Sequence, residues 1–474
     1  MLHPNFPLWT HDDIIKATQG KAFGPSQDSF GCALDSRDVR EGDLFIPIRG
    51  ETTDGHHFIK EAVGRGAVVV LIDHWPSEYS SSRNRPLDVS FIVVKDTFEA
   101  LWALARYARA RFRPDIKIAA ITGSVGKTTT KKALAHILKE QGRVAASAKS
   151  LNTKLGVPLS LIRSPKDADY GVFEIGMSQK GEIAPLSELV KPHVAVITML
   201  APAHFGAFSS LEEIAQEKSE IIKGLSPNGV VILNHDMPLF REISAGIPHQ
   251  KLTFGRSEES DLRLLGVRLL EFGFLEVKAQ FAQEKSPFTY VLQAIGAHFA
   301  YNTLGAILTA RALGADVKKA IESLETFTPE VRRGQYQTLF YEGRELVLLD
   351  ESYNANPTSM QAALEALSYL PKWKGGRMVA VLGDMLELGK ESETFHRAIS
   401  HEIEKHHIDA VFTCGKMMEL LHKVLPLNVQ KVHVDRSQDL FESVKMLLEE
   451  KDNIMVKGSL GMKMDNFVKA LKGE

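Results

Sequence analysis

The chain has 474 residues, of which 44% are hydrophobic and 24% charged; this composition is typical of globular proteins, and the length predicts about three domains. The formal net charge of -2 gives no electrostatic reason to expect a nucleic acid or an anionic membrane as partner. The sequence has no apolar run of about 18 residues, so we predict no membrane span. The N-terminus lacks a basic region followed by a long apolar core, so we predict no signal peptide and expect a cytoplasmic protein.

The first hundred residues have the pattern of a small α/β domain. We expect helices over 10–18, from 56 and over 97–112, and strands at 44–48, 67–72 and 91–94. A boundary is predicted at Arg113-Pro114, because the residue before a proline disfavours helix. Asp35-Ser36-Arg37 is either a polar clamp for an anion or an exposed turn with a surface ion pair. His56 and His57 are expected at a helix start or on the surface rather than as ligands.

Residues 118–130 are the most informative stretch of the chain. An apolar run with β-strand character ends at Thr122, a glycine-bounded loop follows, and an amphipathic helix begins at Lys127. This is the context of a phosphate-binding loop in the short GxxGKT form, since Ile121 stands where the longer motif has its first glycine. The alternative is a glycine turn before a helix that carries Lys-Thr by chance. The predicted nucleotide-binding residues are Gly123, Ser124, Val125, Gly126, Lys127, Thr128 and Thr129, with the Thr128 hydroxyl on Mg²⁺.

Beyond this loop, apolar strands alternate with helices. We expect strands at 144–146, 170–175, 194–198 and 230–233 and helices over 211–225 and 296–313. Buried strands separated by helices predict a mainly parallel sheet with helices on both faces, which binds ligands at the carboxyl ends of its strands. The alternating pattern of 261–293 predicts antiparallel strands packed beside this sheet.

Several polar residues in this region are weighed as site residues against a structural role. Glu174 ends an apolar strand and is either a Mg²⁺ ligand or a solvated strand terminus. His204 is either a metal ligand, for which it is a weak candidate by itself, or an exposed loop histidine. Helix spacing alone makes Lys218 a solvated lysine paired with glutamate. His298 and Asn302 share a helix face, either as site residues or as a polar helix start.

The last third begins at a boundary predicted at Thr328-Pro329. A hairpin over 335–340 and 345–349 is followed by further strands and helices of a second doubly wound domain. Polar loops at 350–357, 383–389 and 457–462 follow strands and should line one edge, where they would present a second reactant to the nucleotide. The predicted fold is thus α/β in three domains: a small α/β domain at 1–113, a central P-loop domain with a doubly wound, mainly parallel sheet at 114–329, and a Rossmann-like domain at 330–474.

Motifs in all three predicted domains resemble the Mur ligase family. They are Asp35-Ser-Arg with Gly42-Asp-Leu-Phe and Asp54-Gly-His, Gly123-Ser-Val-Gly-Lys-Thr-Thr-Thr, Asn152-Thr-Lys-Leu-Gly-Val-Pro, Glu174-Ile-Gly-Met with Gly181-Glu-Ile, Ala203-His204, Tyr353-Asn-Ala-Asn-Pro with Ser359-Met360, and Lys457-Gly-Ser. The resemblance implies that 1–113 binds a UDP-MurNAc-peptide, 114–329 binds ATP and 330–474 binds the amino acceptor.

The resemblance also implies roles for single residues. The catalytic residues would be Lys127, Glu174, His204 and Lys218, the last one carbamylated by CO₂. Two Mg²⁺ ions would be held by Thr128, Glu174, His204 and the carbamylated Lys218. Further ATP contacts would come from Asn302, from Arg333 or its neighbour Arg332, and from Glu351, which stands where an aspartate usually meets the ribose. The substrate-binding residues would be Ser36, Arg37, Asn152, Tyr353, Asn354, Asn356 and Lys457.

The activity implied by the resemblance is ATP-driven amide formation through an acyl phosphate. D-Alanyl-D-alanine would be added to UDP-MurNAc-tripeptide to give UDP-MurNAc-pentapeptide, ADP and phosphate, in peptidoglycan precursor synthesis. The partners would be these small molecules, and the protein is expected to be a monomer. The alternatives are another ligase of the superfamily, such as MurE or folylpolyglutamate synthase, or a P-loop ATPase without ligase chemistry. Tyr353-Asn-Ala-Asn-Pro argues against MurE, the N-terminal motifs argue against the folate enzyme, and Lys218 argues against the ATPase.

Overall fold

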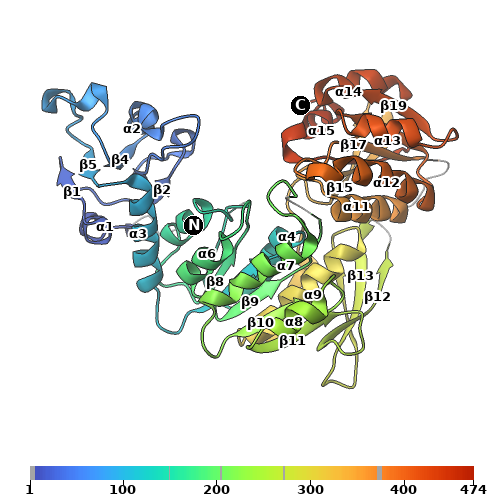
Figure 1. Cartoon of the computed structure of the whole chain (residues 1–474), viewed down its shortest axis with the longest axis horizontal. Helices are drawn as coiled ribbons and strands as arrows, with labels where there is room; N and C mark the ends of the chain where they lie inside the picture. The colour runs from blue at the N-terminus through green and yellow to red at the C-terminus, as the bar shows by residue number, and fades with distance from the viewer. Residues whose placement is uncertain (1–5, 149, 203–204, 271–272, 371–375) are drawn as a thin grey trace. The chain divides into compact units, whose positions relative to one another are not determined.

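The computed structural model describes residues 6–148, 150–202, 205–270, 273–370 and 376–474. It contains three β-sheets, of five, nine and six strands, each accompanied by helices (Figure 1). This confirms the predicted α/β fold. By its internal contacts the chain divides into two compact units. One contains the described residues up to Ile118 with Gly142–Ile175 and Pro185–Lys191, and the other contains Ala119–Gln141, Gly176–Ala184 and Pro192–Glu474.

The N-terminal sheet has the strand order β1-β5-β4-β3-β2, in which β1 is antiparallel to β5 and the other pairs are parallel. Its elements are α1 His11–Thr18, β1 Lys21–Phe23, β2 Gly31–Ala33, β3 Asp43–Phe45, α2 Ile59–Gly64, β4 Ala67–Ile72, β5 Ser90–Val93 and α3 Thr97–Ala110. The predicted helix at 10–18 is confirmed, with the Thr10 hydroxyl accepting the Asp13 N–H at 3.2 Å. The strand predicted at 44–48 ends at Phe45, two residues before Pro47, which has no N–H to donate.

Within the first compact unit, long-range hydrogen bonds tie the N-terminal segment to residues around α5 (Gly156–Ile162). The indole N–H of the fully buried Trp9 donates to the Ile162 carbonyl at 3.0 Å. Arg163 Nε donates to the Cys32 carbonyl at 2.7 Å, and the Trp102 indole donates to the Lys154 carbonyl at 3.1 Å. The N-terminal sheet is therefore packed against a segment that lies far along the chain.

The central sheet has the order β14-β13-β12-β11-β10-β9-β6-β8-β7. Its strands are β6 Lys117–Thr122, β7 Val144–Ala146, β8 Tyr170–Glu174, β9 Val194–Ile197, β10 Val230–Asn234, β11 Gln250–Gly255, β12 Leu262–Leu269, β13 Leu275–Phe281 and β14 Phe288–Leu292. The other helices of this region are α4 Lys127–Lys139, α6 Ile183–Val190, α7 Leu211–Ser219, α8 Phe240–Gly246, α9 Ala297–Ala312 and α10 Val317–Ser323. α4 packs beside α9 (Figure 1).

Two details of this sheet differ from the prediction. β13 is antiparallel to both β12 and β14, as expected, but the three strands extend the main sheet instead of packing beside it, because β12 pairs with β11. β11 itself is not predicted. The helix expected over 211–225 ends at Ser219 and continues as a 3₁₀-helix, Glu220–Gly224.

The C-terminal sheet has the order β15-β16-β20-β17-β18-β19, which confirms a second doubly wound domain and the predicted hairpin. Its strands are β15 Gln335–Tyr341, β16 Arg344–Glu351, β17 Met378–Gly383, β18 Ala410–Cys414, β19 Gln430–Val434 and β20 Asn453–Lys457. Its helices are α11 Pro357–Tyr369, α12 Ser392–Lys405, α13 Met418–Val424, α14 Ser437–Val444 and α15 Asp465–Lys472. Apolar residues of α11, α12 and α13 pack on one face of the sheet, and those of α14 and α15 on the other. The edge strand β19 is not predicted.

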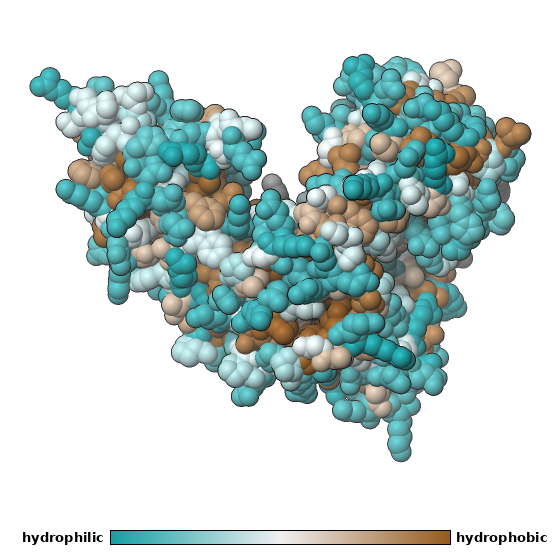
Figure 2. All heavy atoms as spheres, in the orientation of Figure 1, coloured by the Kyte–Doolittle hydropathy of each residue, from teal (hydrophilic) through white to brown (hydrophobic). Residues whose placement is uncertain are grey.

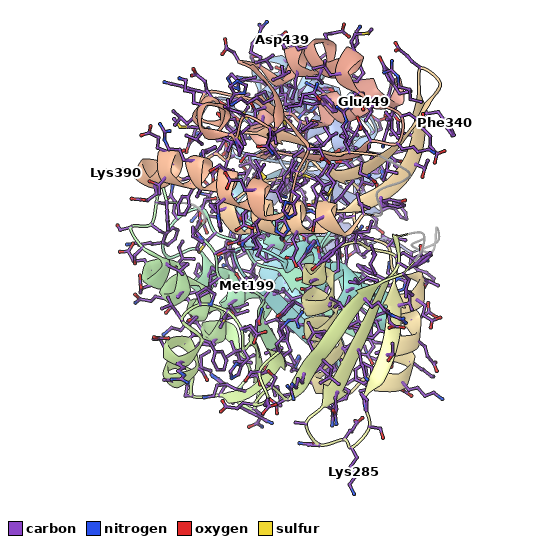
Figure 3. The ribbon with its side chains drawn as sticks, turned by 90° about the vertical axis from the view of Figure 1, so that its right-hand side faces the viewer. Met199, Lys285, Phe340, Lys390, Asp439 and Glu449 are labelled. Carbon is purple, nitrogen blue, oxygen red and sulfur yellow. The ribbon has the colours of Figure 1, made fainter. Side chains whose placement is uncertain are left out.

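The molecular surface is mixed in character. Figure 2 shows a face on which hydrophilic side chains predominate and hydrophobic atoms form small groups. Phe340, 74% exposed, points away from the edge strand β15 (Figure 3). Among the described residues, no helix has the length and apolar character needed to cross a membrane.

Candidate functional site

Two glycines shape the loop between β6 and α4. Gly123 and Gly126 have φ values of 149° and 85°, in the region that favours glycine. A Cβ on Gly123 would lie 2.0 Å from Thr198 Oγ1, and one on Gly126 would lie 2.4 Å from Asn302 Oδ1. Neither position has room for a side chain, so the loop has the close backbone packing that a phosphate loop requires.

Neighbouring groups hold this loop in place. The Thr198 hydroxyl, directly after β9, donates to the Val125 carbonyl at 2.6 Å, and the Ser124 N–H donates to the Met199 carbonyl at 2.7 Å. Lys127 Nζ donates to the Gly123 carbonyl at 2.7 Å, which places its ammonium over the loop. Sequence reasoning missed Thr198, whose signal was a hydroxyl at the end of an apolar strand.

The loop is suited to a polyphosphate. The buried Ser124 Oγ has no hydrogen-bond partner among the described residues. Gly126 precedes α4 without a side-chain cap, so the N–H groups of the first helical turn face the loop beside Lys127. Thr128, 2% exposed, lies in this first turn, where its hydroxyl could reach a metal ion bound with the nucleotide. These features favour the phosphate loop over a chance glycine turn.

Asn302 lies against this loop. Its Oδ1 accepts the Thr130 hydroxyl at 3.4 Å and occupies the space that a side chain at Gly126 would need. His298, one turn earlier on α9, has its Nε2 4.0 Å from Glu351 Oε1. Burial lowers the pKa of His298, and the Glu351 carboxylate opposes this shift.

Glu174 ends β8 with its side chain buried, since the residue is 1% exposed. Its Oε1 accepts a hydrogen bond from Asn152 Nδ2 at 2.7 Å, so the structure brings these two predicted residues together. The alternative of a solvated strand terminus is therefore wrong. His204 lies outside the described residues.

Lys218 lies on the buried face of α7 and is 1% exposed. The interpretation from spacing alone, a solvated helix lysine, is wrong, because the residue continues the core-facing positions of Ile214 and Ile221. Burial lowers the pKa of Lys218 well below its ordinary value, and the nearby Lys127 lowers it further. The neighbouring Glu217 is turned to the backbone, where its carboxylate accepts the N–H groups of Gly181 and Ile183 at 2.8 and 3.0 Å.

At the carboxyl ends of the C-terminal strands, Lys457 and Glu351 form a nearly buried ion pair. The two residues are direct partners in the parallel pairing of β16 and β20, and Lys457 Nζ lies 3.3 Å from Glu351 Oε2. Their side chains are 3% and 12% exposed, and Lys457 Nζ also donates to the Asn354 carbonyl at 3.0 Å. Burial lowers the pKa of Lys457, while Glu351 raises it.

This ion pair gives a stability prediction. Lys457→Met and Glu351→Gln should each destabilise the protein by about 3 kcal/mol, because each leaves its partner's charge in a desolvated place. The double variant should recover part of this loss, by about 1–3 kcal/mol of coupling. Chemical denaturation of the four proteins measures this, and strictly additive losses would show that the two charges do not stabilise each other.

The two candidate arginines have different partners. Arg332 Nε donates to Ser352 Oγ at 3.1 Å, and its Nη2 lies 3.3 Å from Asp465 Oδ1. The Arg333 guanidinium stacks on the Tyr353 ring at 3.8 Å. Asn356 caps α11 in a capping box with Ser359, so its side chain has a structural use, whereas Asn354 is exposed.

The predicted anion clamp has a mixed outcome. Arg37 is 77% exposed and pairs with Asp35, whose pKa it lowers to about 2, so the surface ion pair is present. Ser36 is buried, and its hydroxyl donates to Glu61 Oε2 at 2.8 Å.

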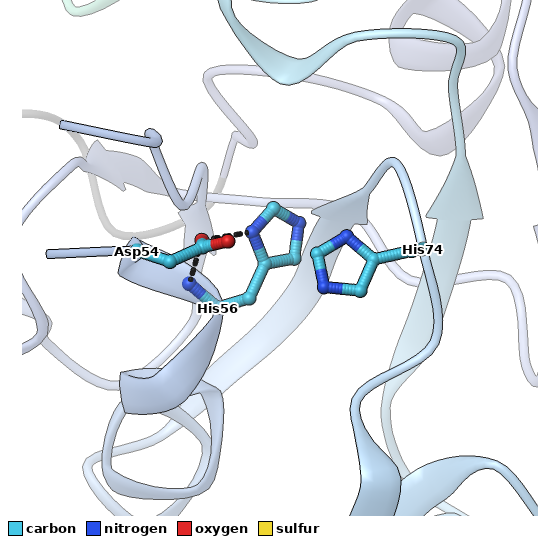
Figure 4. A group of neighbouring side chains, drawn as sticks. All are labelled: Asp54, His56 and His74. Atoms are coloured by element: carbon cyan, nitrogen blue, oxygen red, sulfur yellow. Dashed lines mark hydrogen bonds and ion pairs between the residues drawn. The ribbon is translucent and has the colours of Figure 1, made fainter. Parts of the chain in front are cut away.

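Asp54, His56 and His74 form a group with potential metal ligands (Figure 4). Asp54 Oδ1 accepts both the backbone N–H of His56 and its Nδ1–H, at 3.0 and 2.7 Å, and the Asp73 N–H donates to His56 Nε2 at 3.4 Å. Both ring nitrogens of His56 are thus engaged within the protein. We interpret the group as the hydrogen-bonded start of the helical segment at 55–64, as predicted for His56.

Comparison with known proteins covers most of the chain. Three family models match: the Mur ligase family catalytic domain at residues 31–109, the Mur ligase middle domain at 121–310, and the Mur ligase glutamate ligase domain at 338–460. The UDP-N-acetylmuramoyl-tripeptide--D-alanyl-D-alanine ligase of Bacillus subtilis is 33% identical over 98% of both chains.

Solved structures show the same relationship. MurF from Acinetobacter baumannii superposes with a TM-score of 0.84 at 28% identity, over 98% of this chain and 99% of that one. MurF ligase from Thermotoga maritima, solved in complex with ADP, gives a TM-score of 0.77 at 27% identity, over 94% and 97% of the two chains. With the phosphate loop, the buried Lys218 and the ion-paired strand edge in place, these matches establish that the chain belongs to the Mur ligase family and is similar to its MurF members.

Proposed function

We propose that the protein is an ATP-dependent ligase that adds D-alanyl-D-alanine to UDP-N-acetylmuramoyl-tripeptide. The observation that carries this proposal is the fully buried Lys218 close to Lys127 of a well-formed phosphate loop. A regulatory ATPase has no use for a buried second lysine there, whereas a ligase that brings a carboxylate to a triphosphate must balance additional negative charge.

The reaction has two balanced steps. A carboxylate oxygen of the tripeptide attacks the γ-phosphorus of ATP, and ADP leaves. The amine of D-alanyl-D-alanine then attacks the acyl carbon, and phosphate leaves as the amine loses its proton. Lys127 and the N–H groups at the start of α4 reduce the repulsion between the carboxylate and the phosphates.

The metal site is part of the proposal. Mg²⁺ prefers oxygen ligands, and we assign Thr128, Glu174, His204 and carbamylated Lys218 to two ions, which would add positive charge at the phosphates. A neutral amine is the form that adds CO₂, releasing a proton and giving an anionic carbamate. Burial favours the neutral amine of Lys218, and the Lys127 cation would stabilise the resulting carbamate.

The remaining assignments follow the same scheme. We assign UDP-MurNAc-peptide binding to 1–113, with Ser36 and Arg37, ATP binding to 114–329, and acceptor binding to 330–474. We assign Asn152, which is hydrogen-bonded to Glu174, to substrate binding. The other proposed contacts are Asn302, Arg333 and Glu351 for ATP, and Tyr353, Asn354, Asn356 and Lys457 for the substrates. We further propose a monomer that acts in the cytoplasm, where ATP is available.

A phosphate-release assay tests the function. Phosphate should appear only when ATP, Mg²⁺, D-alanyl-D-alanine and a UDP-MurNAc-tripeptide are all present, and tripeptides ending in diaminopimelate or lysine should be compared. Equal ATP turnover without the dipeptide would identify an ATPase. Turnover with a single amino acid in place of the dipeptide, on a UDP-MurNAc-dipeptide, would identify a MurE-like ligase.

A further inference from the structure

Ser459 joins three loops at the carboxyl ends of the C-terminal strands. Its Oγ accepts the Leu386 N–H at 2.8 Å and donates to the Ala355 carbonyl at 3.3 Å. Its own N–H donates to the Asp384 carbonyl at 3.0 Å. Because Ser459 is 4% exposed, these bonds are shielded from water. One residue of the loop after β20 thus fixes the loops after β16 and β17.

His396 binds the same segment through a neighbouring backbone N–H. It is fully buried on α12, and its Nδ1 donates to the Ser392 carbonyl at 2.6 Å. Nε2 is therefore the acceptor of the neutral ring, and it takes the Met385 N–H at 3.0 Å. The consecutive N–H groups of Met385 and Leu386 are bound by His396 and Ser459, respectively.

These bonds present two exposed side chains at the strand edge. Leu386, whose own N–H is the second of the held amides, is 44% exposed, and Asn354 is exposed directly before Ala355. The carbonyl of Asn354 is held in addition by Lys457 at 3.0 Å. Ser459 and His396 are buried beneath these loops, so any effect on a ligand acts through the loops.

We propose that Ser459 and His396 are positioning residues for the amino acceptor, a dipeptide amine, in the ligation proposed above. They hold the 384–388 segment and Ala355 at a fixed separation, so that the acceptor meets a preformed edge. The inference rests on the proposed function for one point, the binding of the acceptor at this edge; the hydrogen bonds that hold the loops are independent of it.

Ser459→Ala should raise the KM for D-alanyl-D-alanine about tenfold, since two hydrogen bonds of about 1 kcal/mol each are lost and water replaces them in part. The KM for ATP should change less than twofold. Ser459→Thr, which keeps the hydroxyl, should restore the acceptor KM. Ser400→Ala is the matched control, because the Ser400 hydroxyl bonds within its own helix at the surface. An unchanged acceptor KM in Ser459→Ala, or equal changes for both substrates, would overturn the proposal.

His396 gives an independent test by pH. A protonated ring carries a hydrogen on Nε2 and cannot accept the Met385 N–H, so the acceptor KM should rise on the acid side. Burial lowers the pKa of His396 from 6.5, with the Asp384 carboxylate as the opposing charge, so the rise begins below pH 6.5. His396→Gln offers Oε1 as a permanent acceptor and should remove the part of this rise that comes from the ring, whereas His396→Leu should raise the KM at all pH values. The exposed His401→Gln on the same helix is the control.

The outcomes separate the two proposals. If wild-type protein releases no phosphate with the dipeptide, the proposed function fails. Protonation of the dipeptide's own amine raises the acceptor KM in all variants alike. If the wild type is active but His396→Gln shows the same acid rise as His401→Gln, the positioning role of His396 fails. Thermal unfolding of each variant accompanies the kinetics, and His396→Gln decides the question even where Ser459→Ala unfolds.

Discussion

Replacing Lys127 with methionine is expected to lower kcat about a thousandfold while the protein remains folded. The ammonium lies over the phosphate loop, where Nζ donates to the Gly123 carbonyl. It is the charge best placed to neutralise the transferred phosphate, and methionine keeps the aliphatic stem without the charge. Phosphate release in the presence of all substrates measures the loss.

A second lysine of the same helix provides the control for this prediction. Lys139 lies exposed in the last turn of α4, so Lys139→Met should keep kcat within about twofold. Nucleotide affinity, measured by calorimetry, should fall for Lys127→Met and remain unchanged for Lys139→Met. Activity above a tenth of wild type in Lys127→Met would remove Lys127 from the phosphate site.

Lys218→Ala is expected to lose most of its activity and to regain part of it with added acetate. The variant removes the amine that adds CO₂ and leaves a buried space in which a small carboxylate can replace the carbamate. A spectroscopic test is independent of turnover: protein equilibrated with ¹³C-labelled bicarbonate should show a carbamate carbon signal that is absent from Lys218→Ala.

The exposed Lys223 in the following 3₁₀-helix is the matched control, and Lys223→Ala should keep both the activity and the ¹³C signal. Full activity in Lys218→Ala would exclude Lys218 from the site. Activity lost without rescue by acetate, together with a wild-type protein that shows no carbamate carbon, would mean that Lys218 acts as an amine.

Local patterns were sufficient for much of the fold and for the phosphate loop. The strand, glycines, lysine and threonine of 118–130 interact with one another within a few residues, so their order in the sequence determines their geometry. The edge strand β19 and the strand β11 were missed because neither has a continuous buried apolar run. The first two residues of β11 are exposed, and no residue of β19 is fully buried.

Residues whose role depends on a distant partner were harder to predict. The pairing of Lys457 with Glu351 follows from the register of two strands about a hundred residues apart, which no local pattern encodes. Lys218 was detectable in principle, because Ile214, Lys218 and Ile221 have the spacing of one buried helix face. His396 gave no signal, since its contact outside its own helix is with the backbone N–H of Met385, in the loop after β17.

The bond between the Trp9 indole and the Ile162 carbonyl spans 153 positions of the sequence. During synthesis the N-terminal segment emerges first, yet Trp9 obtains its acceptor only after Ile162 has left the ribosome tunnel. A fragment cut at residue 113 would keep the five strands but expose the indole and the unsatisfied carbonyl of Cys32. The nascent N-terminal region therefore stays incompletely packed until the segment around Ile162 and Arg163 has been synthesised and binds to it.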